Sequence, residues 1–280
     1  MVSSDPSRIW PAPAKINLFL HVTGRRPNGY HELQTLFQFL DYGDELRVAP
    51  TDDGEIERLG AGQDDLPAED LTIRAARLLQ SATSTRAGAR IELKKRIPVG
   101  AGLGGGSSDA ATALIALNRL WGAGLDRAQL GRLGLQLGAD VPVFLHGRAA
   151  WAEGVGELLT DLAPPEHWYG VIIPPVSVST GKVFGDPALT RDHPPIKIRD
   201  FSSGLAINDL EEATCRLYSE VAETLTWLRQ YGEARMSGSG SSLFLACEDR
   251  ARAEEIVNQR PPGTDGFVAR GANRHPLLGV

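Results

Sequence analysis

The segment PVGAGLGGGSS, which spans Pro98 to Ser108, restricts what this chain can fold into more than any other feature of the sequence. Five glycines and two serines lie between Gly100 and Ser108, and an alanine-rich pattern with helical spacing follows them. Each glycine costs backbone entropy, and a tight turn without a ligand needs only about one or two of them. Backbone N–H groups that converge in front of a helix N-terminus form a site for phosphate groups. The segment therefore predicts a loop that binds a polyphosphate, with a helix beginning behind it.

Two well-known phosphate-binding loops fit this segment poorly. Gly100, Gly102 and Gly105 have the GxGxxG spacing of a dinucleotide-binding loop, which would make the protein an oxidoreductase. Such a loop precedes a second strand that ends in an acidic residue about twenty positions on, whereas here WGAGLD and a second helical pattern follow. A Walker A loop is excluded because Ser107 and Ser108 stand there without the required lysine. The segment is thus a different kind of nucleotide loop, and an oxidoreductase is the least favoured alternative.

Charge and cysteine content restrict the partners and the compartment. The 280 residues include 29 Lys and Arg against 35 Asp and Glu, a net charge of −6, which argues against a surface that binds nucleic acid. Cys215 and Cys247 lack the spacing of a zinc site or a disulfide framework, so we expect a cytoplasmic protein. The N-terminus lacks a signal-peptide pattern, and no run of about 18 apolar residues occurs. We therefore expect neither export nor a membrane span.

Apolar periodicity predicts a chain that is rich in strands at its start and helical in its middle. The expected strands cover residues 16–22, 36–48 and 91–93, and the expected helices cover residues 71–79, 109–121, 126–137 and 209–231. Asp70 is a candidate N-cap for the first of these helices. The apolar side of the last helix is expected to consist of Leu210, Leu217, Val221, Leu225 and Leu228.

Two further segments carry local predictions. Pro142 should hold Val141 in an extended conformation, which would place Asp140 at the exit of the helix over 126–137. The segment MSGSGSSLFLAC, from Met236 to Cys247, predicts a glycine-rich turn that leads into a buried strand. Because the chain has no repeat and no long linker, we expect two closely joined lobes rather than separable domains.

Three segments resemble the motifs of the GHMP kinases. PAPAKINLFLHVTGRRPNGYHEL is similar to the first motif, PVGAGLGGGSSDAA to the central one and MSGSGSSLFLAC to the third, and together they span nearly the whole chain. The resemblance implies an α+β fold with two lobes and a substrate cleft between them. The expected lobes are a ribosomal-protein-like nucleotide-binding lobe at 1–160 and a substrate lobe of sheet and helices at 161–280. ATP is the implied phosphoryl donor, with Mg²⁺ expected beside it.

Within the family, APAKINLFLHVTGRRPNGYH and GADVPVFLHG are similar to a group of kinases with one substrate, 4-diphosphocytidyl-2-C-methyl-D-erythritol. This resemblance implies transfer of the γ-phosphoryl group of ATP to the tertiary 2-hydroxyl of that substrate, a step of non-mevalonate isoprenoid biosynthesis. A mevalonate or homoserine kinase is the nearest alternative, and Tyr30, His31 and Phe184 favour the cytidine substrate instead. A sensor of the same fold that binds without turnover is a further alternative, and the joint presence of Lys15 and Asp140 argues against it.

The resemblance also implies roles for individual residues. Asp140 would be the catalytic base, and Lys15 would be the cation that stabilises its charge. Without the resemblance, Asp140 would be interpreted as a residue at a helix end and Lys15 as a surface lysine of a strand. Asn17 lies two residues after Lys15, on the same face of the strand, and can hydrogen-bond a substrate hydroxyl. The implied ATP-binding residues are Pro98, Val99, Gly100, Ala101, Gly102, Leu103, Gly104, Gly105, Gly106, Ser107 and Ser108.

The implied cytosine site places Tyr30 and Phe184 on opposite faces of the base, with His31 beside them. Val155 and Thr180 match the same pocket, although such residues are commonly packing residues. Further candidate substrate-binding residues in the third motif are Gly238 and Gly240, for which the alternative is a simple turn.

Two expectations concern the nucleotide. Where the family has an asparagine near adenine, this chain has Asp70, whose carboxylate lacks the amide donor; this departure predicts a looser preference for ATP. No protein metal site is assigned, and the hydroxyl of Ser107 is the only candidate ligand for Mg²⁺.

Overall fold

The computed structural model describes residues 8–60, 66–67, 69–200 and 207–280. Its strands are β1 (Trp10–Arg25), β2 (His31–Thr51), β3 (Ile56–Leu59), β4 (Gly88–Lys94), β5 (Ala150–Glu153), β6 (Leu158–Asp161), β7 (Trp168–Ile173), β8 (Arg235–Met236), β9 (Leu243–Cys247) and β10 (Asp265–Ala272). Its α-helices are α1 (Leu71–Thr83), α2 (Gly105–Leu120), α3 (Arg127–Leu137), α4 (Val141–His146), α5 (Thr180–Gly185), α6 (Asp209–Leu217), α7 (Ser219–Leu228) and α8 (Arg250–Asn258), and one 3₁₀ turn covers Ile198–Asp200.

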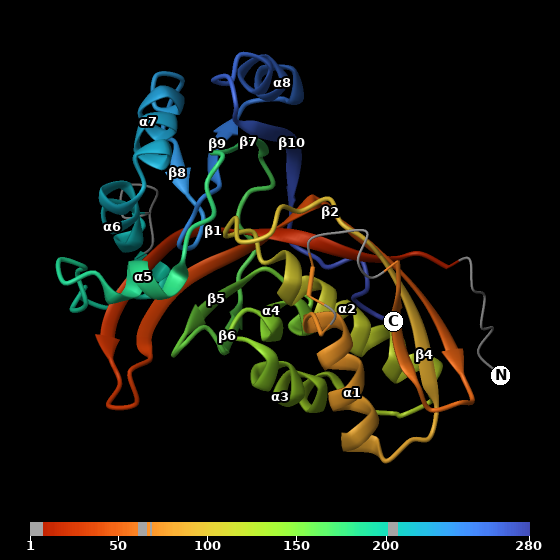
Figure 1. Ribbon diagram of the computed structural model, residues 1–280. Helices are drawn as coiled ribbons and strands as arrows, with labels where there is room; N and C mark the ends of the chain where they lie inside the picture. Colours follow the sequence, from red (N-terminus) through yellow and green to blue (C-terminus); the bar gives the residue numbers. More distant parts are fainter. Residues whose placement is uncertain (1–7, 61–65, 68, 201–206) are drawn as a thin grey trace.

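One mixed sheet runs through the described part of the chain, in the order β3-β4-β2-β10-β7-β9-β8. β1 pairs with β2 along an antiparallel register, and β5 pairs with both β2 and β6. In Figure 1, α1 to α4 lie below the long red strand β1, whereas α7 and α8 lie above it beside β7 to β10. The long strands β1 and β2 therefore connect two lobes.

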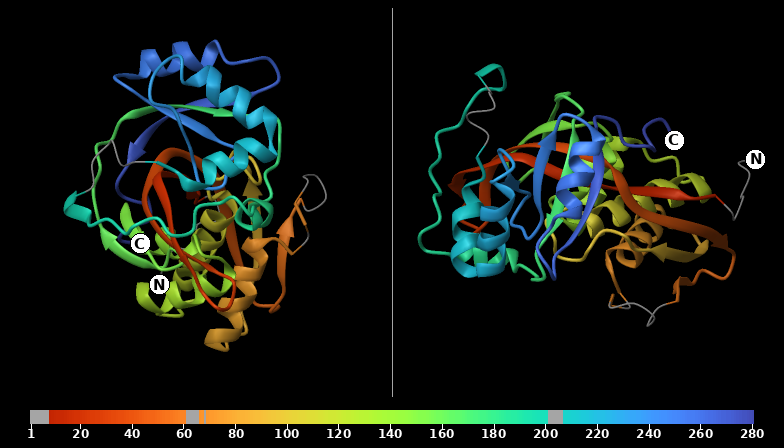
Figure 2. Two further views of the ribbon diagram at one scale, coloured as in Figure 1. Left: turned by 90° about the vertical axis from the view of Figure 1, so that its left-hand side faces the viewer. Right: turned by 90° about the horizontal axis from the view of Figure 1, so that it is seen from above.

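Each lobe has its own apolar core, and a third cluster joins them. Buried residues of β1, β2, β4 and α1 to α4 form the first core, and β7, β9 and α6 to α8 contribute most of the second. The joining cluster includes Ile16 and Leu103 together with Val171 and Phe244, all of them buried. Figure 2 shows the two groups of elements meeting at β1 and β2. No helix in the described ranges has the length and apolar character that crossing a bilayer requires.

Most of the predicted elements are confirmed. The strands expected over 16–22, 36–48 and 91–93 lie inside β1, β2 and β4, and the helices expected over 71–79, 109–121 and 126–137 correspond to α1, α2 and α3. The carboxylate of Asp70 caps α1, as expected, because it accepts hydrogen bonds from the N–H groups of Thr72 and Ile73 at 2.7 and 3.1 Å. The alanine-rich helix begins at Gly105, inside the glycine-rich segment.

The prediction for the segment around Asp140 is wrong. Val141 is not extended, because α4 begins there with Pro142 in its first turn. Proline is accepted at this position, since the N–H groups of a first turn have no acceptor within the helix. Asp140 is therefore the N-cap of α4 and lies three residues beyond the end of α3.

The single long helix expected over 209–231 is also wrong. Tyr218 has φ −137° and ψ 98°, which ends α6 before α7 begins. Its hydroxyl accepts a hydrogen bond of 3.0 Å from the N–H of Ser179, next to α5. Leu217 is the last residue of α6, directly before the break, and it is 45% exposed instead of belonging to the predicted apolar side. The other predicted apolar residues, Leu210, Val221, Leu225 and Leu228, are buried.

Candidate active site

The glycine-rich loop connects β4 to α2. Gly100, Gly102 and Gly104 have φ values of +70°, +75° and +71°, which side chains with a Cβ rarely adopt. Gly104 is the N-cap of α2 and offers no side chain to the N–H groups of the first turn. Those groups and the positive end of the helix are suited to bind an anion.

The loop lines two cavities. The first, of about 410 Å³, lies against the beginning of α1 and the side chains of Lys95 and Asp109. The second, of about 330 Å³, contains Lys15 and Asp140. The two cavities share Gly100, Gly102 and Ser107, so ligands bound in them would approach each other at the loop.

All the predicted ATP-binding residues from Pro98 to Ser107 line the first cavity. Ser108 is fully buried in α2 and is not among the lining residues of either cavity. A Cβ at Gly104 would lie 3.0 Å from Cε of Lys15, so the absence of a side chain there leaves room for that lysine.

Lys15 and Asp140 form the ion pair that the resemblance implied. The ammonium of Lys15 lies 3.1 Å from Oδ2 of Asp140 and donates a hydrogen bond of 2.6 Å to Oδ1 of Asn17. Lys15 is 2% exposed, whereas the Asp140 side chain is 36% exposed and lines the second cavity. The pair therefore presents a carboxylate to a ligand while its cation is held by the protein.

Two further polar contacts fix this arrangement. The amide nitrogen of Asn17 donates to the hydroxyl of Thr35 at 2.9 Å, and that hydroxyl donates to the carbonyl of Phe19. The Asn17 amide can therefore offer only its oxygen to the ammonium, which orients both side chains. Ser237 joins the third motif to this strand, because its hydroxyl accepts from the N–H of Asn17 and donates to the carbonyl of Gly102. No local sequence pattern assigns Thr35 or Ser237 to the site.

The structure brings most of the predicted substrate residues to the second cavity. Its walls include Asn17, Val155, Thr180, Phe184, Gly238 and Gly240. The hydroxyls of Thr180 and Ser239 lie 2.8 Å apart and connect the start of α5 to the third motif. These residues come from segments up to 223 positions apart (240 − 17), which only folding brings together.

Tyr30 lies in the turn between β1 and β2, and His31 is the first residue of β2; neither is among the lining residues of this cavity. Tyr30 is 62% exposed. The ring stacked on Phe184 is that of His31, with centroids 4.8 Å apart and planes at 28°. The sandwich of a base between Tyr30 and Phe184 therefore stays a prediction about the bound state.

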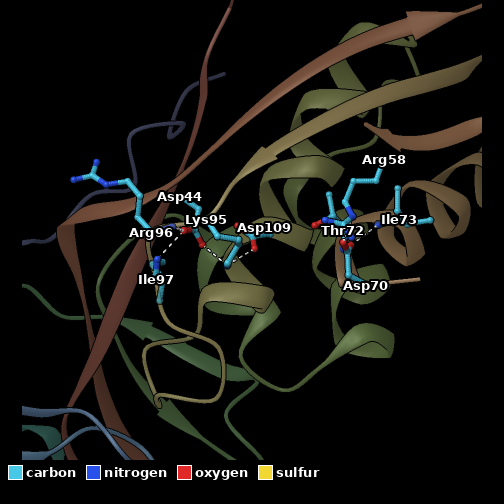
Figure 3. Close-up of polar contacts among 9 residues, drawn as sticks. All are labelled: Asp44, Arg58, Asp70, Thr72, Ile73, Lys95, Arg96, Ile97 and Asp109. Atoms are coloured by element: carbon cyan, nitrogen blue, oxygen red, sulfur yellow. Dashed lines mark hydrogen bonds and ion pairs between the residues drawn. The ribbon is translucent and has the colours of Figure 1, made fainter. Parts of the chain in front are cut away.

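Three charged residues without a role assigned from the sequence form a cluster beside the glycine-rich loop (Figure 3). Lys95 and Asp109 line the first cavity, whereas Asp44 does not. The ammonium of Lys95 bridges the carboxylates of Asp44 and Asp109, at 2.7 Å from Oδ2 of Asp109. The other oxygen of Asp44 accepts hydrogen bonds from the N–H groups of Arg96 and Ile97, at 2.5 and 2.8 Å. Asp44 thus anchors the backbone that leads from β4 into the glycine-rich loop. The signal available in the sequence was the position of Lys95 and Asp109 on either side of that loop.

Burial raises the pKa of Asp109 to about 8, with Lys95 opposing and Asp44 reinforcing the shift. A carboxyl whose pKa is higher in the folded than in the unfolded protein stabilises the fold at low pH, and this contribution is lost as pH rises through the folded pKa. Asp109→Asn should therefore flatten the pH dependence of the unfolding free energy between about pH 4 and about pH 8, a range in which the wild-type protein loses stability as the pH rises.

Urea unfolding across this pH range measures the effect, with Asp52→Asn, at an exposed position, as the control. Parallel stability curves for wild type and Asp109→Asn would show that the Asp109 carboxyl is ionised in the folded protein.

Asp70 lines the first cavity, but its carboxylate is engaged by the protein. One oxygen caps α1, and the other lies 2.9 Å from Nε of the buried Arg58 (Figure 3). The negative charge that replaces the family's asparagine is thus paired with a guanidinium. This pairing reduces its effect on a bound base.

The chain matches two family descriptions and many curated proteins. Residues 70–148 match the GHMP kinases N terminal domain, and residues 188–261 match the GHMP kinases C terminal domain. A protein of Alkalilimnicola ehrlichii named 4-diphosphocytidyl-2-C-methyl-D-erythritol kinase is 54% identical over 273 residues, covering 98% of this chain and 94% of that protein. A protein of Thiobacillus denitrificans with the same name is 53% identical, covering 97% and 98%.

Solved structures agree with these matches. The crystal structure of a 4-(cytidine 5'-diphospho)-2C-methyl-D-erythritol kinase superposes with a TM-score of 0.83 at 38% identity, covering 95% of this chain and 99% of that chain. A homoserine kinase from Cytophaga hutchinsonii, at 19% identity and a TM-score of 0.69 with 95% of both chains covered, shares the fold. The predicted two-lobed α+β fold is confirmed, and the chain belongs to the GHMP kinase family.

Proposed function

We propose that the protein is the ATP-dependent kinase that phosphorylates the 2-hydroxyl of 4-diphosphocytidyl-2-C-methyl-D-erythritol, in the cytoplasm, for isoprenoid precursor synthesis. One observation carries the proposal: the two cavities meet at Gly100, Gly102 and Ser107, and the pair of Lys15 and Asp140 lies in the second of them. The relatives that match nearly the whole chain bear the name of this kinase. We also propose a nucleotide lobe at 1–160 and a substrate lobe at 161–280.

The geometry supports a direct transfer. ATP in the first cavity would lay its phosphates along the loop and the N-terminus of α2. The Asp140 carboxylate takes the proton of the substrate hydroxyl, the hydroxyl oxygen bonds to the γ-phosphorus, and the bond to the β-phosphate oxygen breaks to leave ADP. The ammonium of Lys15, 3.1 Å from Asp140, orients the carboxylate and stabilises the negative charge that develops near it during the transfer.

Mg²⁺ would arrive with ATP, since this ion binds through substrate phosphates and few protein ligands. In the described residues no group of three His, Cys, Asp or Glu side chains could hold a metal. The Ser107 hydroxyl lies where the cavities meet and fits as a ligand. Bound there, the ion would neutralise charge on the β- and γ-phosphates.

A turnover assay tests the substrate. Release of ADP is followed with ATP and Mg²⁺ for 4-diphosphocytidyl-2-C-methyl-D-erythritol, mevalonate, homoserine and galactose. The cytidine compound should exceed the others in kcat/KM by orders of magnitude. Comparable or higher activity with another of these compounds would assign the protein to a different specificity within the family.

Phe184→Ala should weaken binding of the cytidine substrate about ten- to a hundredfold and leave ATP affinity nearly unchanged. A stacked aromatic ring contributes about 1 to 3 kcal/mol per base, and Phe184 lines only the second cavity. Calorimetry with each ligand measures both affinities. Phe267→Ala is a matched control, because that half-buried ring stacks on Tyr42, away from both cavities. Equal loss of both affinities together with a lower melting temperature would make Phe184 a core residue.

A further inference from the structure

Arg191 lies in the segment between α5 and the 3₁₀ turn, and its guanidinium connects three carbonyls at and after the end of α5 to the start of β2. Nη2 donates to the carbonyls of Phe184 and Asp186, at 2.8 and 2.7 Å, and Nη1 donates to the carbonyl of Leu189 at 3.0 Å. Nε donates to Nε2 of His31 at 3.2 Å. In Figure 1 this segment follows α5 and lies beside the red hairpin of β1 and β2.

The contact between Arg191 and His31 decides which nitrogen of the imidazole carries the proton. An arginine Nε–H can only donate, so Nε2 of His31 must accept. A neutral imidazole that accepts through Nε2 carries its hydrogen on Nδ1. Burial, Arg191 and Arg25 all lower the pKa of His31, which favours this neutral form. Among the described residues, none accepts a hydrogen bond from Nδ1 of His31, so this donor is available to a ligand.

The same arginine also holds the backbone of Phe184, the residue whose ring lies against His31. The carbonyl of Phe184 accepts from Nη2, and the Phe184 ring lines the second cavity while stacking on His31. Arg191 thus holds Phe184 and the histidine stacked on its ring in a fixed relation to each other.

We propose that Arg191 is a positioning residue for the nucleobase end of the substrate site: it holds His31 as an Nδ1–H donor beside Phe184 and thereby selects a base with an unprotonated ring nitrogen. The proposal deepens the function proposed above and rests on it for the cytidine substrate. Cytosine presents unprotonated N3 and O2 to such a donor, whereas N3 of uracil carries a hydrogen. A histidine fixed in this tautomer therefore favours cytidine over uridine.

Nitrogen NMR of the histidine-labelled wild-type protein tests the tautomer without any variant of Arg191. The His31 signals, assigned by their loss in His31→Gln, should show a protonated Nδ1 and an unprotonated Nε2. A protonated Nε2, or a rapidly averaged pair of tautomers, would overturn the proposal. This measurement does not depend on which substrate the enzyme phosphorylates.

Binding of CDP and UDP to Arg191→Gln tests the consequence. The preference for CDP over UDP should fall about tenfold relative to wild type, the effect of one lost hydrogen bond, with the KM for ATP unchanged. Arg191→Lys keeps the charge but lacks the planar fork, so it should not restore the preference. Full restoration by lysine, or an unchanged preference in Arg191→Gln, would overturn the proposal.

Arg216→Gln is the matched control. Arg216 also reaches the turn after α5, through the side chain of Asp186 at 3.1 Å, but it has no contact with His31. Arg216→Gln removes a contact to the same turn and should keep the CDP preference and the His31 tautomer. An equal loss of preference in Arg216→Gln would mean that loosening this turn is sufficient, which contradicts a specific role for Arg191. A wild-type enzyme without activity on the cytidine substrate would overturn the proposed function, while the tautomer and the CDP preference would still decide the role of Arg191.

Discussion

Asp140→Asn should lower kcat by a factor of about 10² to 10⁴, the usual effect of losing a general base. The amide has nearly the same shape as the carboxylate but cannot take the proton of the substrate hydroxyl. Asp140 caps α4 without a side-chain hydrogen bond to the helix, so the change should leave the fold and both ligand affinities near those of wild type. The ammonium of Lys15 keeps the oxygen of Asn17 as a partner.

Steady-state kinetics and the melting temperature together test this expectation. Asp126→Asn serves as the control, since Asp126 is the N-cap of α3 and asparagine is an equally good cap. A kcat within a few-fold of wild type would remove Asp140 from the proton transfer and leave it a purely electrostatic partner of Lys15.

Gly102→Ala should cost on the order of 3 kcal/mol of unfolding free energy and abolish binding of both ligands. A Cβ at Gly102 would lie 2.3 Å from the carbonyl oxygen of Ser237 and 2.9 Å from that of Gly240. These contacts are backbone, so neither side can yield without separating the glycine-rich loop from the third motif. The two cavities share Gly102, and displacing it disturbs both.

Gly122→Ala separates the steric clash of a new Cβ from the backbone strain of a positive φ. Gly122 has φ +64°, close to the +75° of Gly102, but a Cβ there would meet nothing within 4 Å. It should cost only the strain of a positive φ, about 1 to 2 kcal/mol, and leave ligand binding intact. If chemical unfolding gives the same loss for both variants, and Gly102→Ala still binds ATP, the close approach of the two loops does not matter for the site.

The sequence alone carried much of the local structure of this protein. The strand that bears Lys15 and Asn17 follows from alternation over a few residues, and a period of two puts both side chains on one face, where they are hydrogen-bonded. The glycine-rich loop and the cap at Asp70 likewise depend on backbone freedom and hydrogen bonds between near neighbours. Such features can be predicted from the sequence because the residues that cause them lie within about four positions of one another.

Residue roles in the site came from the family resemblance, and the tertiary structure decided which of those residues meet. The pair of Lys15 and Asp140 joins positions 125 apart (140 − 15), and no periodicity connects them. Local rules also failed at Val141, where the first turn of a helix accepts the proline that follows, and at Tyr218, where a contact with Ser179 accompanies a break in a strongly amphipathic pattern.

Buried charged clusters cannot be predicted from the sequence, as the cluster of Asp44, Lys95 and Asp109 shows. Each alone has the appearance of a surface charge. Their burial becomes tolerable only because Lys95, just after β4, pairs with Asp44 of β2 and hydrogen-bonds Asp109 of α2. Arg191 is similar, since its role depends on His31, 160 residues away in the chain. Periodicity and capping act between near neighbours in the chain, so the sequence itself determined them. The desolvation and pairing of charges depend on which distant segments pack together, and only the tertiary structure decided that.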